Sequence, residues 1–421
     1  MILAAGKGER LEPLTLSRPK HLLPVAGSPL IVHTLKAVKS VGIDEALIVV
    51  HYMKEAISSY LGDGSSLSVK LQYADQGGIF GTGHALKMAQ DFVGGEPFLL
   101  VYGDLAFHPD VLKRAVSAYS KKLSGVLVGV DLEDVHDYGA MELDGDLLRR
   151  FIEKPKSGGA GTINGGIYLF SPQIFKFVDA TPKSQRGELE LTTTINLSIE
   201  QGGSFRVLHV SSDEWVDVGR PWNVLEANKM LMDACLKEST ILGKVEEGVR
   251  LHGKVYVGDG ASVLSGSYVE GPVWISSGCK VGPNCYLRPY TFLCRGARVG
   301  NACEVKASII MDGSHIGHIS YIGDSVIGAK CNLGAGTITA NLRFDDMPVK
   351  VAVKDKRSSS GKKKLGMFMG DGVKTGINVS VYPGVKIGPG SWIKPHVVLN
   401  KDVLPGMIVS SKIELEMMPR R

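Results

Sequence analysis

The sequence has no apolar stretch that approaches the ~18 residues needed to cross a membrane as a helix, although 44% of its 421 residues are hydrophobic. Its first residues read as a strand and lack the basic n-region of a signal peptide. A hydrophobic content of 44% together with a charged content of 22% is typical of a globular chain and excludes a disordered one. We therefore expect a globular chain of two or three domains without a membrane partner.

Cysteine is scarce and the net charge is small. The six cysteines contain no CxxC pair and no metal-ligand spacing, which argues against a zinc site and fits the reducing cytoplasm, where we expect the protein to reside. The formal net charge of +5 is too mild to indicate a nucleic-acid partner. Aromatic residues are also few, at 7%, whereas glycine is abundant, with 52 residues.

The first glycines follow the first apolar run, in the segment MILAAGKGERL. A glycine loop directly after a strand usually approaches a phosphate closely. The pattern is not a P-loop, and the third glycine of a dinucleotide fingerprint would stand where this chain has Leu11. Lys7 and Arg10 add two cations, which suits a free triphosphate. The alternative is an ordinary strand-to-helix turn with solvated cations.

The first half of the chain, to about residue 222, alternates strand and helix patterns. Apolar runs at 44–50, 97–104 and 124–131 predict buried strands of the parallel type, and residues 83–92 predict a helix. These patterns predict a Rossmann-like α/β domain with an open, mostly parallel sheet and helices on both sides. Ligands of such sheets lie at the carboxyl ends of the strands.

The second half follows a period of six. Aliphatic residues recur at every sixth position from Val257 to Val305, and the residue two positions before each is usually small. Residues two apart on a strand face the same way, so both point inward. This pattern predicts a parallel β-helix of hexapeptide repeats. Four cysteines occupy the small inward position, where packing is favoured over chemistry: Cys279, Cys285, Cys303 and Cys331.

These two patterns divide the chain. We expect an α/β domain over 1–222, a helical connector over 223–242, a β-helix over 243–409 and a C-terminal tail over 410–421.

The repeat is interrupted by an insert at 341–366 that contains KDKRSSSGKKK, with six cations in eleven residues. We hypothesise that these cations attract anionic substrates, and the alternative is a solvated loop.

Four side chains are expected at the carboxyl edge of the α/β sheet. Lys20 lies on a loop between prolines, and Gln76 precedes a Gly-Thr-Gly turn into a helix, where its amide could pair with a base edge. Asp104 lies just past an apolar strand pattern, and Asp217 has a similar position at a strand end. Two carboxylates beside a phosphate loop suit Mg²⁺, which takes one or two carboxylates plus phosphate oxygens.

The motifs LAAGKGERL, RPKHLLPVAG, GTGHAL, YGD, FIEKP and INGGIYLF resemble those of sugar-1-phosphate nucleotidyltransferases, over nearly all of 1–222. These enzymes make a nucleotide sugar and pyrophosphate from a nucleoside triphosphate and a sugar phosphate. The resemblance implies UTP or dTTP as substrate and Mg²⁺ bound by Asp104 and Asp217. It implies Arg10 and Lys20 as catalytic cations. It also implies nucleotide contacts by Leu3, Ala5, Gly6, Lys7, Gly8, Gln76, Gly81 and Thr82, and sugar-phosphate contacts by Gly139, Glu153, Lys154 and Asn164. One departure is Thr193, which stands where the family usually has an acid.

In the second half, EVKASII, GHISYIGD and NLGAGTITAN resemble the acetyltransferase half of bifunctional N-acetylglucosamine-1-phosphate uridylyltransferases. Beyond Asn341 the chain instead resembles the archaeal bifunctional sugar-1-phosphate nucleotidyltransferase/acetyltransferases. These resemblances imply acetyl-CoA as substrate, a left-handed coil and a homotrimer. They imply His318 as the base, oriented by Glu304. They imply a site for an amino-sugar phosphate built from Arg288, Glu304, Lys306, Tyr321, Asn332, Asn341 and Lys350.

Two other interpretations remain open. In the first, the nucleotidyltransferase is active and the β-helix only oligomerises or binds effectors. In the second, the chain is a non-catalytic binding subunit, like the similarly built subunits of the translation initiation guanine-exchange factor. Retention of four acetyltransferase residues argues against the first: His318, Lys306, Tyr321 and Asn341. The presence of the phosphate-loop cations and of both metal aspartates argues against the second: Lys7, Arg10, Asp104 and Asp217.

Overall fold

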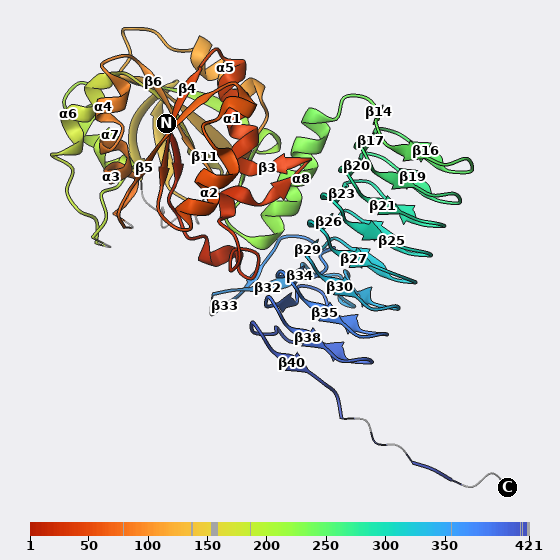
Figure 1. The fold of residues 1–421 in the computed structure, drawn as a ribbon. Helices are drawn as coiled ribbons and strands as arrows, with labels where there is room; N and C mark the ends of the chain where they lie inside the picture. The colour runs from red at the N-terminus through yellow and green to blue at the C-terminus, as the bar shows by residue number, and fades with distance from the viewer. Residues whose placement is uncertain are drawn as a thin grey trace. The chain divides into compact units, whose positions relative to one another are not determined.

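The computed structural model describes the chain except residues 79, 136–137, 153–158, 186, 355, 413, 415 and 419–421. The chain divides into two compact units (Figure 1). The first comprises Met1–Gly8, Arg18–Leu23 and Ser28–Gly219, and the second comprises Glu9–Ser17, Pro24–Gly27 and Arg220–Arg421. Two short segments near the N-terminus are therefore grouped with the C-terminal half.

The first unit is built on a nine-stranded sheet. In spatial order its strands are β5 (Lys70–Asp75), β4 (Glu45–Val50), β1 (Ile2–Ala4), β6 (Phe98–Tyr102), β11 (Gly161–Phe170), β8 (Gly125–Leu132), β12 (Phe205–Ser211), β10 (Leu147–Ile152) and β9 (Ala140–Asp144). Only β11 and β10 run against the direction of the others. The predicted mostly parallel sheet is confirmed, and the apolar runs at 44–50, 97–104 and 124–131 form β4, β6 and β8.

Helices cover both faces of this sheet (Figure 1). Ile48 of β4 packs in one cluster with Ile31 of α1 and Ile57 of α2, whereas Val49 packs in another with Leu86 of α3. Since adjacent strand residues point to opposite faces, these clusters lie on opposite sides of the sheet. One face carries α1 (Leu30–Ser40), α2 (Lys54–Leu61) and α5 (Asp110–Ser117). The other carries α3 (Thr82–Lys87), α4 (Gln90–Val93), α6 (Phe175–Val178) and α7 (Leu191–Glu200).

The helix predicted at 83–92 is divided between α3 and α4. The amides of Met88 and Ala89 bond to the carbonyls three residues earlier, at 3.2 and 3.0 Å, which tightens the chain and interrupts the helix. Ala89 is nonetheless buried, so the expected apolar face is retained.

The C-terminal part of the second unit begins with helix α8 (Pro221–Cys235) and continues as a parallel β-helix with three sheets. The first sheet contains β14 (Thr240–Ile241), β17 (Val255–Val257), β20 (Val273–Ile275), β23 (Thr291–Leu293), β26 (Ile309–Ile310), β29 (Val326–Ile327), β34 (Phe368–Met369) and β37 (Lys386–Ile387). The second contains β15 (Lys244–Val245), β18 (Ser262–Val263), β21 (Lys280–Val281), β24 (Arg298–Val299), β27 (His315–Ile316), β30 (Asn332–Leu333), β35 (Lys374–Thr375), β38 (Trp392–Ile393) and β40 (Ile408–Val409). The third contains β16 (Arg250–His252), β19 (Tyr268–Glu270), β22 (Tyr286–Leu287), β25 (Glu304–Lys306), β28 (Tyr321–Gly323), β31 (Ile338–Thr339), β36 (Ser380–Val381) and β39 (Val398–Leu399).

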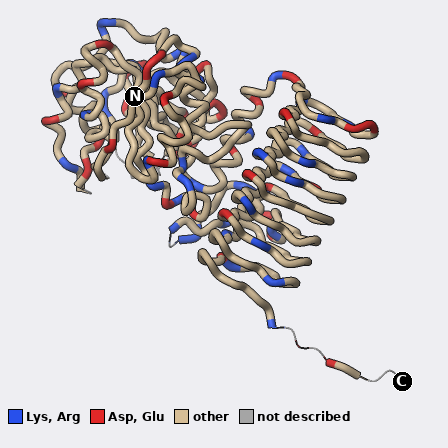
Figure 2. Tube along the Cα trace, in the orientation of Figure 1, with Lys and Arg blue, Asp and Glu red and all other residues tan. Residues whose placement is uncertain are grey.

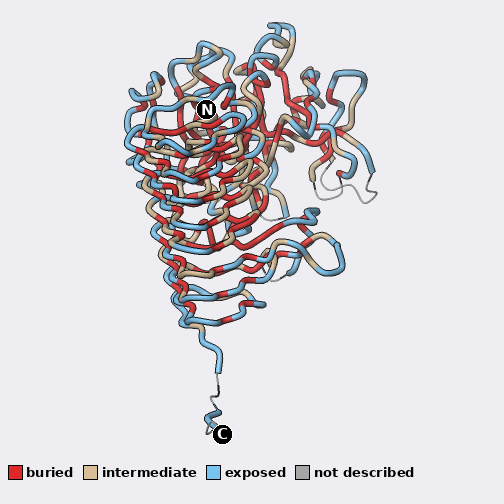
Figure 3. Tube along the Cα trace, turned by 90° about the vertical axis from the view of Figure 1, so that its right-hand side faces the viewer, coloured by how far each residue is buried: buried red, intermediate tan, exposed pale blue. Residues whose placement is uncertain are grey.

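The inward positions are those that the six-residue period predicts. Val257, Val281 and Val305 are each 0% exposed, and the same core continues through Ile316 to Leu399. Figure 3 shows buried positions recurring from one coil to the next. Between β31 and β34 the chain leaves the coil and forms a hairpin of β32 (Lys350–Val353) and β33 (Lys356–Ser359).

The cysteines in the coil are packing residues. The thiol of Cys279 donates to the carbonyl of Cys294 at 3.0 Å, and that of Cys285 donates to Gly300 at 2.8 Å. Burial raises the pKa of Cys279 and of Cys331 to about 12, so both thiols keep their protons at neutral pH. These cysteines fill the coil as protonated thiols, as their inward position predicts.

Candidate functional sites

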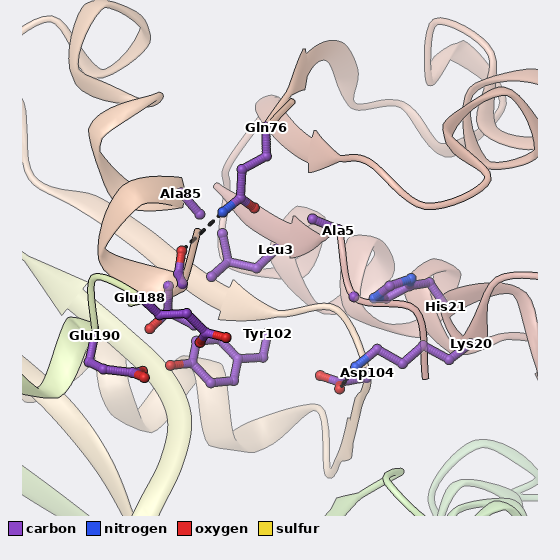
Figure 4. Close-up of a pocket in the computed structure, with 13 residues that line it drawn as sticks. Leu3, Ala5, Lys20, His21, Gln76, Ala85, Tyr102, Asp104, Glu188 and Glu190 are labelled. Atoms are coloured by element: carbon purple, nitrogen blue, oxygen red, sulfur yellow. Dashed lines mark hydrogen bonds and ion pairs between the residues drawn. The ribbon is translucent and has the colours of Figure 1, made fainter. Parts of the chain in front are cut away.

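A cavity of about 270 Å³ lies in the first unit, where β1, β5 and β6 end (Figure 4). Its walls come from segments far apart in the sequence. Eight residues predicted for the nucleotidyl site line it: Leu3, Ala5, Gly6, Lys20, Gln76, Gly81, Thr82 and Asp104. Five others that the sequence analysis did not identify line it as well: His21, Ala85, Tyr102, Glu188 and Glu190.

A cation and a carboxylate meet at one end of the cavity. The Lys20 ammonium forms an ion pair with Asp104, and both side chains are largely buried, at 17% and 15% exposure. Burial has the largest single influence on the pKa of Asp104 and raises it, but the Lys20 charge, the hydrogen bond from Lys20 and smaller contributions together lower the pKa of the carboxyl. A Cβ at Gly6 would lie 3.2 Å from Lys20 Nζ, so glycine leaves room for the lysine to reach this position.

The second aspartate lies on a neighbouring strand. Asp217 ends β13 (Trp215–Asp217), which pairs antiparallel with β7 (Leu105–Phe107), so Asp217 is opposite Leu105. The amide of Val218 also donates to the carbonyl of Asp104 at 3.1 Å. Among the residues that the structure describes, no three or more His, Cys, Asp or Glu side chains are grouped so as to hold a metal. One or two carboxylates plus phosphate oxygens are what Mg²⁺ takes, so this pair fits that ion.

The turn that follows Gln76 is fixed to a segment that precedes α7. Gln76, 7% exposed, donates its side-chain amide to the carbonyl of Gly81 at 3.0 Å. The amide of Gly83 donates to the carbonyl of Leu189 at 2.7 Å, and a Cβ at Gly81 would lie 2.3 Å from the same oxygen. Glu188 and Glu190 flank this contact, which explains how they reach the cavity.

His21 is a buried neutral side chain in the same wall. Burial lowers its pKa to about 3, and the adjacent Lys20 charge contributes. The imidazole is therefore uncharged at neutral pH.

The predicted sugar residues lie on and beside β11. The carbonyl of Gly139 accepts from the amide of Asn164 at 3.2 Å. The side-chain oxygen of Asn164 accepts from the Tyr168 hydroxyl at 2.8 Å, and this hydroxyl lies 3.2 Å from that of Tyr102. Asn164 is thus connected to the cavity wall through two tyrosines. Glu153 and Lys154 lie outside the described residues.

The predicted triphosphate cations lie around η1 (Glu9–Leu11). Gly8 has φ +72°, in the left-handed region that glycine adopts without strain. Lys7 is exposed. Arg10 belongs to the segment grouped with the second unit.

A second cluster lies on the outer face of the third sheet of the β-helix. Tyr286, Glu304 and Tyr321 are in register on neighbouring strands. Arg288 donates to Glu304 at 2.9 Å, with its guanidinium 5.6 Å from the Tyr286 ring. Arg288 and Glu304 are thus brought together as one ion pair.

Asp324 lies in one hydrogen-bond network with three of the predicted residues. It accepts from Lys306 Nζ at 3.0 Å and from Asn341 Nδ2 at 2.5 Å, and Asn341 Nδ2 lies 3.1 Å from the Tyr321 hydroxyl. Asp324 is not among the residues predicted from the sequence. It follows β28 and has φ +49°, a corner conformation that aspartate tolerates.

The remaining predicted residues lie apart from this network. His318 is exposed, and within the described chain no hydrogen bond joins it to Glu304. Asn332 is in register with His315 and Lys374 on the second sheet. Lys350 begins β32, and its carbonyl accepts from Arg357 at 2.8 Å. The orientation of His318 by Glu304 stays a prediction.

A family model for nucleotidyl transferases matches residues 1–234, more than half of the chain. The chain belongs to the nucleotidyl transferase family. A model of the GMPPB C-terminal domain also matches residues 269–356.

Full-length relatives in archaea resemble both halves of this nucleotidyl transferase. The bifunctional protein GlmU of Methanocaldococcus jannaschii is 42% identical over 99% of this chain and 98% of its own. The bifunctional sugar-1-phosphate nucleotidylyltransferase/acetyltransferase of Sulfurisphaera tokodaii is 44% identical over 96% and 97%.

A solved structure agrees with the fold of the first half. It is a Bacillus anthracis protein named as a glucose-1-phosphate thymidylyltransferase, in complex with a sucrose. It is 28% identical, has a TM-score of 0.51 and covers 57% of this chain and 96% of its own. None of the helices that the structure describes is long and apolar enough to cross a membrane.

Proposed function

We propose that this chain is a bifunctional enzyme. Its first half transfers UMP or dTMP from the nucleoside triphosphate to a sugar 1-phosphate and releases pyrophosphate. Its second half N-acetylates glucosamine 1-phosphate or galactosamine 1-phosphate with acetyl-CoA. The observation that carries the first activity is the buried Lys20–Asp104 pair inside a cavity that also contains Gln76 and Thr82.

The nucleotidyl step needs positioning more than covalent catalysis. A phosphate oxygen of the sugar 1-phosphate attacks the α-phosphorus, and the bond to the pyrophosphate leaving group breaks. Gln76 and Gly81 hold the base, the loop of Gly6 and Lys7 holds the triphosphate, and Arg10 and Lys20 neutralise its charge. Gly139 and Asn164 border the sugar, with Glu153 and Lys154 proposed beside it.

Asp104 and Asp217 are the carboxylates that would hold Mg²⁺. The donor set fits this ion because Asp104 stays ionised and Asp217 lies on the paired strand. When bound, Mg²⁺ supplies charge neutralisation at the phosphate oxygens.

In the acetyltransferase site, Arg288, Lys306 and Lys350 would bind the sugar phosphate, with Tyr321, Asn332 and Asn341 around the sugar. His318 would take the proton that the amine loses when it attacks the acetyl thioester. The exposed position of His318 supports this role, because the base must reach the substrate.

We further propose a cytoplasmic homotrimer with acetyl sites between subunits. The outer face of the third sheet supports this, because Ile338 and Val398, 42% and 59% exposed, lie in the column that holds Glu304 and Tyr321. Sedimentation of the purified protein should give three times the mass of one chain.

One panel of assays tests the enzymatic proposal. Pyrophosphate release is measured for UTP, dTTP, ATP and GTP against glucose 1-phosphate and N-acetylglucosamine 1-phosphate. CoA release is measured separately with glucosamine 1-phosphate and galactosamine 1-phosphate. Pyrophosphate release confined to the pyrimidine nucleotides is expected. No pyrophosphate from any pair, or no CoA release with either amino sugar, would refute the corresponding activity.

A further inference from the structure

A second cavity, of about 180 Å³, lies within the second unit beside α8. Three segments build it: one face of α8, the corner turns of the coil, and the end of the insert. Its lining includes Trp222 and Lys229 from α8, Tyr290 and Asp324 from the corners, and Lys364 from the insert. None of these residues was assigned to either active site by the sequence.

One wall of this cavity is apolar and firmly held. Trp222 and Leu365 are 4% and 2% exposed. Tyr290 is held on α8 because Asn228 donates to its carbonyl at 3.0 Å. The insert is fixed on the other side, where the amide of Leu365 donates to the carbonyl of Asn341 at 2.8 Å. The wall is therefore preformed.

The acidic groups of the cavity already have cationic partners. Glu226 pairs with Lys362 at 2.7 Å, and Asp324 pairs with Lys306 at 3.0 Å. Lys229 lies 5.2 Å from the centre of the Tyr290 ring. Lys229 and Lys364 are both exposed, and in the part of the chain that the structure describes neither forms an ion pair, so both ammonium groups are available to an anion.

The structure also changes the expected role of the insert. Figure 2 shows Lys and Arg residues along the β32–β33 hairpin. Three of the six cations in the KDKRSSSGKKK run have partners: Lys354 pairs with Glu9 at 3.1 Å, Lys362 with Glu226, and Arg357 with the carbonyl of Lys350. The insert is thus an ordered element whose last lysines contribute to one cavity.

We propose that this cavity binds a phosphate monoester, with Lys229 and Lys364 contacting the phosphate and the wall of Trp222 and Leu365 covering the attached carbon groups. Lysine ammonium groups are effective phosphate ligands. The volume is below the roughly 300–1,000 Å³ typical of drug-sized ligands, so a phosphate and a short organic part fit better than a nucleotide. Both a hexose 1-phosphate and the 3′-phosphate of CoA have this chemistry.

Trp222 lies in the wall and provides a signal that does not depend on either enzymatic activity. Tryptophan fluorescence of the full chain is followed while glucosamine 1-phosphate, CoA or dephospho-CoA is added, and Trp222→Phe should remove the response. In the Lys229→Gln/Lys364→Gln double variant the dissociation constant should rise at least about tenfold, which corresponds to about 1.4 kcal/mol. The difference in dissociation constant between the double variant and the wild type should shrink at high salt.

Lys363→Gln is the matched control, since Lys363 is exposed in the same segment and does not line the cavity. The Lys363→Gln variant should have the dissociation constant of the wild type. The Lys229→Arg variant, which keeps the charge, should have a dissociation constant within about threefold of the wild-type value. A lysine-dependent response to CoA but not to dephospho-CoA assigns the 3′-phosphate, and one to glucosamine 1-phosphate assigns the sugar phosphate. The proposal is overturned if the double variant binds all three probes as the wild type does, or if Lys363→Gln weakens binding equally.

Discussion

The two units bring their functional residues together in different ways. In the α/β unit, Gln76 and Asp104 come together because parallel strands end at one edge of the sheet, and Lys20 reaches the same edge from η2 (Lys20–Leu22). In the β-helix, Glu304 and Tyr321 meet because successive coils stack in register. In a repeat, the spacing along the sequence therefore determines which residues meet. In an open sheet, the topology of the strands determines it.

We expect the largest effect on activity from a variant that disables the nucleotidyl site alone. Asp104→Asn removes a charge that orders Lys20 and would hold Mg²⁺, so pyrophosphate release should fall by about 10³–10⁵, the range for losing a charge-stabilising group in phosphoryl transfer. Acetyl transfer should be unchanged. Asp213→Asn, at an exposed position, is the control. A parallel loss of both activities in a folded protein would contradict two independent sites.

The converse variant acts in the β-helix. His318→Ala should lower acetyl transfer by about 10²–10⁴, the usual contribution of a positioned base, and leave pyrophosphate release intact. His315→Ala is the comparison, since His315 lies three residues earlier in the same coil, in β27 of the second sheet. Unchanged CoA release in the His318 variant would remove this residue from the mechanism.

Asp324 tests whether stacking alone positions the acetyltransferase residues. Asp324→Asn removes the charge that holds Lys306 and Asn341, and hydrogen bonds to charged groups contribute about 1.5–3 kcal/mol. We expect the KM for glucosamine 1-phosphate to rise about 10-fold to 100-fold, with a smaller change in kcat. Asp346→Asn is matched, because Asp346 also has a left-handed φ, of +53°. If both variants behave alike, Asp324 has no special role.

The smallest effect concerns the stability of the coil at high pH. Burial raises the pKa of Cys279 and Cys331 from 9.0 to about 12, so the unfolded chain loses these protons before the folded chain does. Their contribution is complete below pH 9 and is lost as the pH rises toward 12. Replacing both by serine should flatten the decline in Tm between pH 9 and 11. Calorimetry across this range should show no such flattening for Cys235→Ser.

Much of the architecture could be predicted because the spacing of apolar residues follows from the geometry of strands and coils. The six-residue period fixes which side chains point inward, and Val257 to Val305 are buried as it requires. The apolar runs of β4 and β6 indicated a sheet, and strand ends indicated where Asp104 would lie. Glu188 and Glu190 could not be found in this way, because they reach the cavity through a backbone contact of Leu189 with Gly83 that has no sequence signal.

The sequence by itself determined the two folds, the inward columns of the coil and the position of the first glycine loop, because periodicity and turn chemistry act over short distances. Only the tertiary structure decided that Asp324 joins Lys306 to Asn341 and that the insert closes a cavity against α8. It also decided that Pro24–Gly27 belongs with the second unit, where a Cβ at Gly27 would lie 2.3 Å from the Trp274 ring. These outcomes depend on packing between distant segments, whose free energy no local pattern encodes.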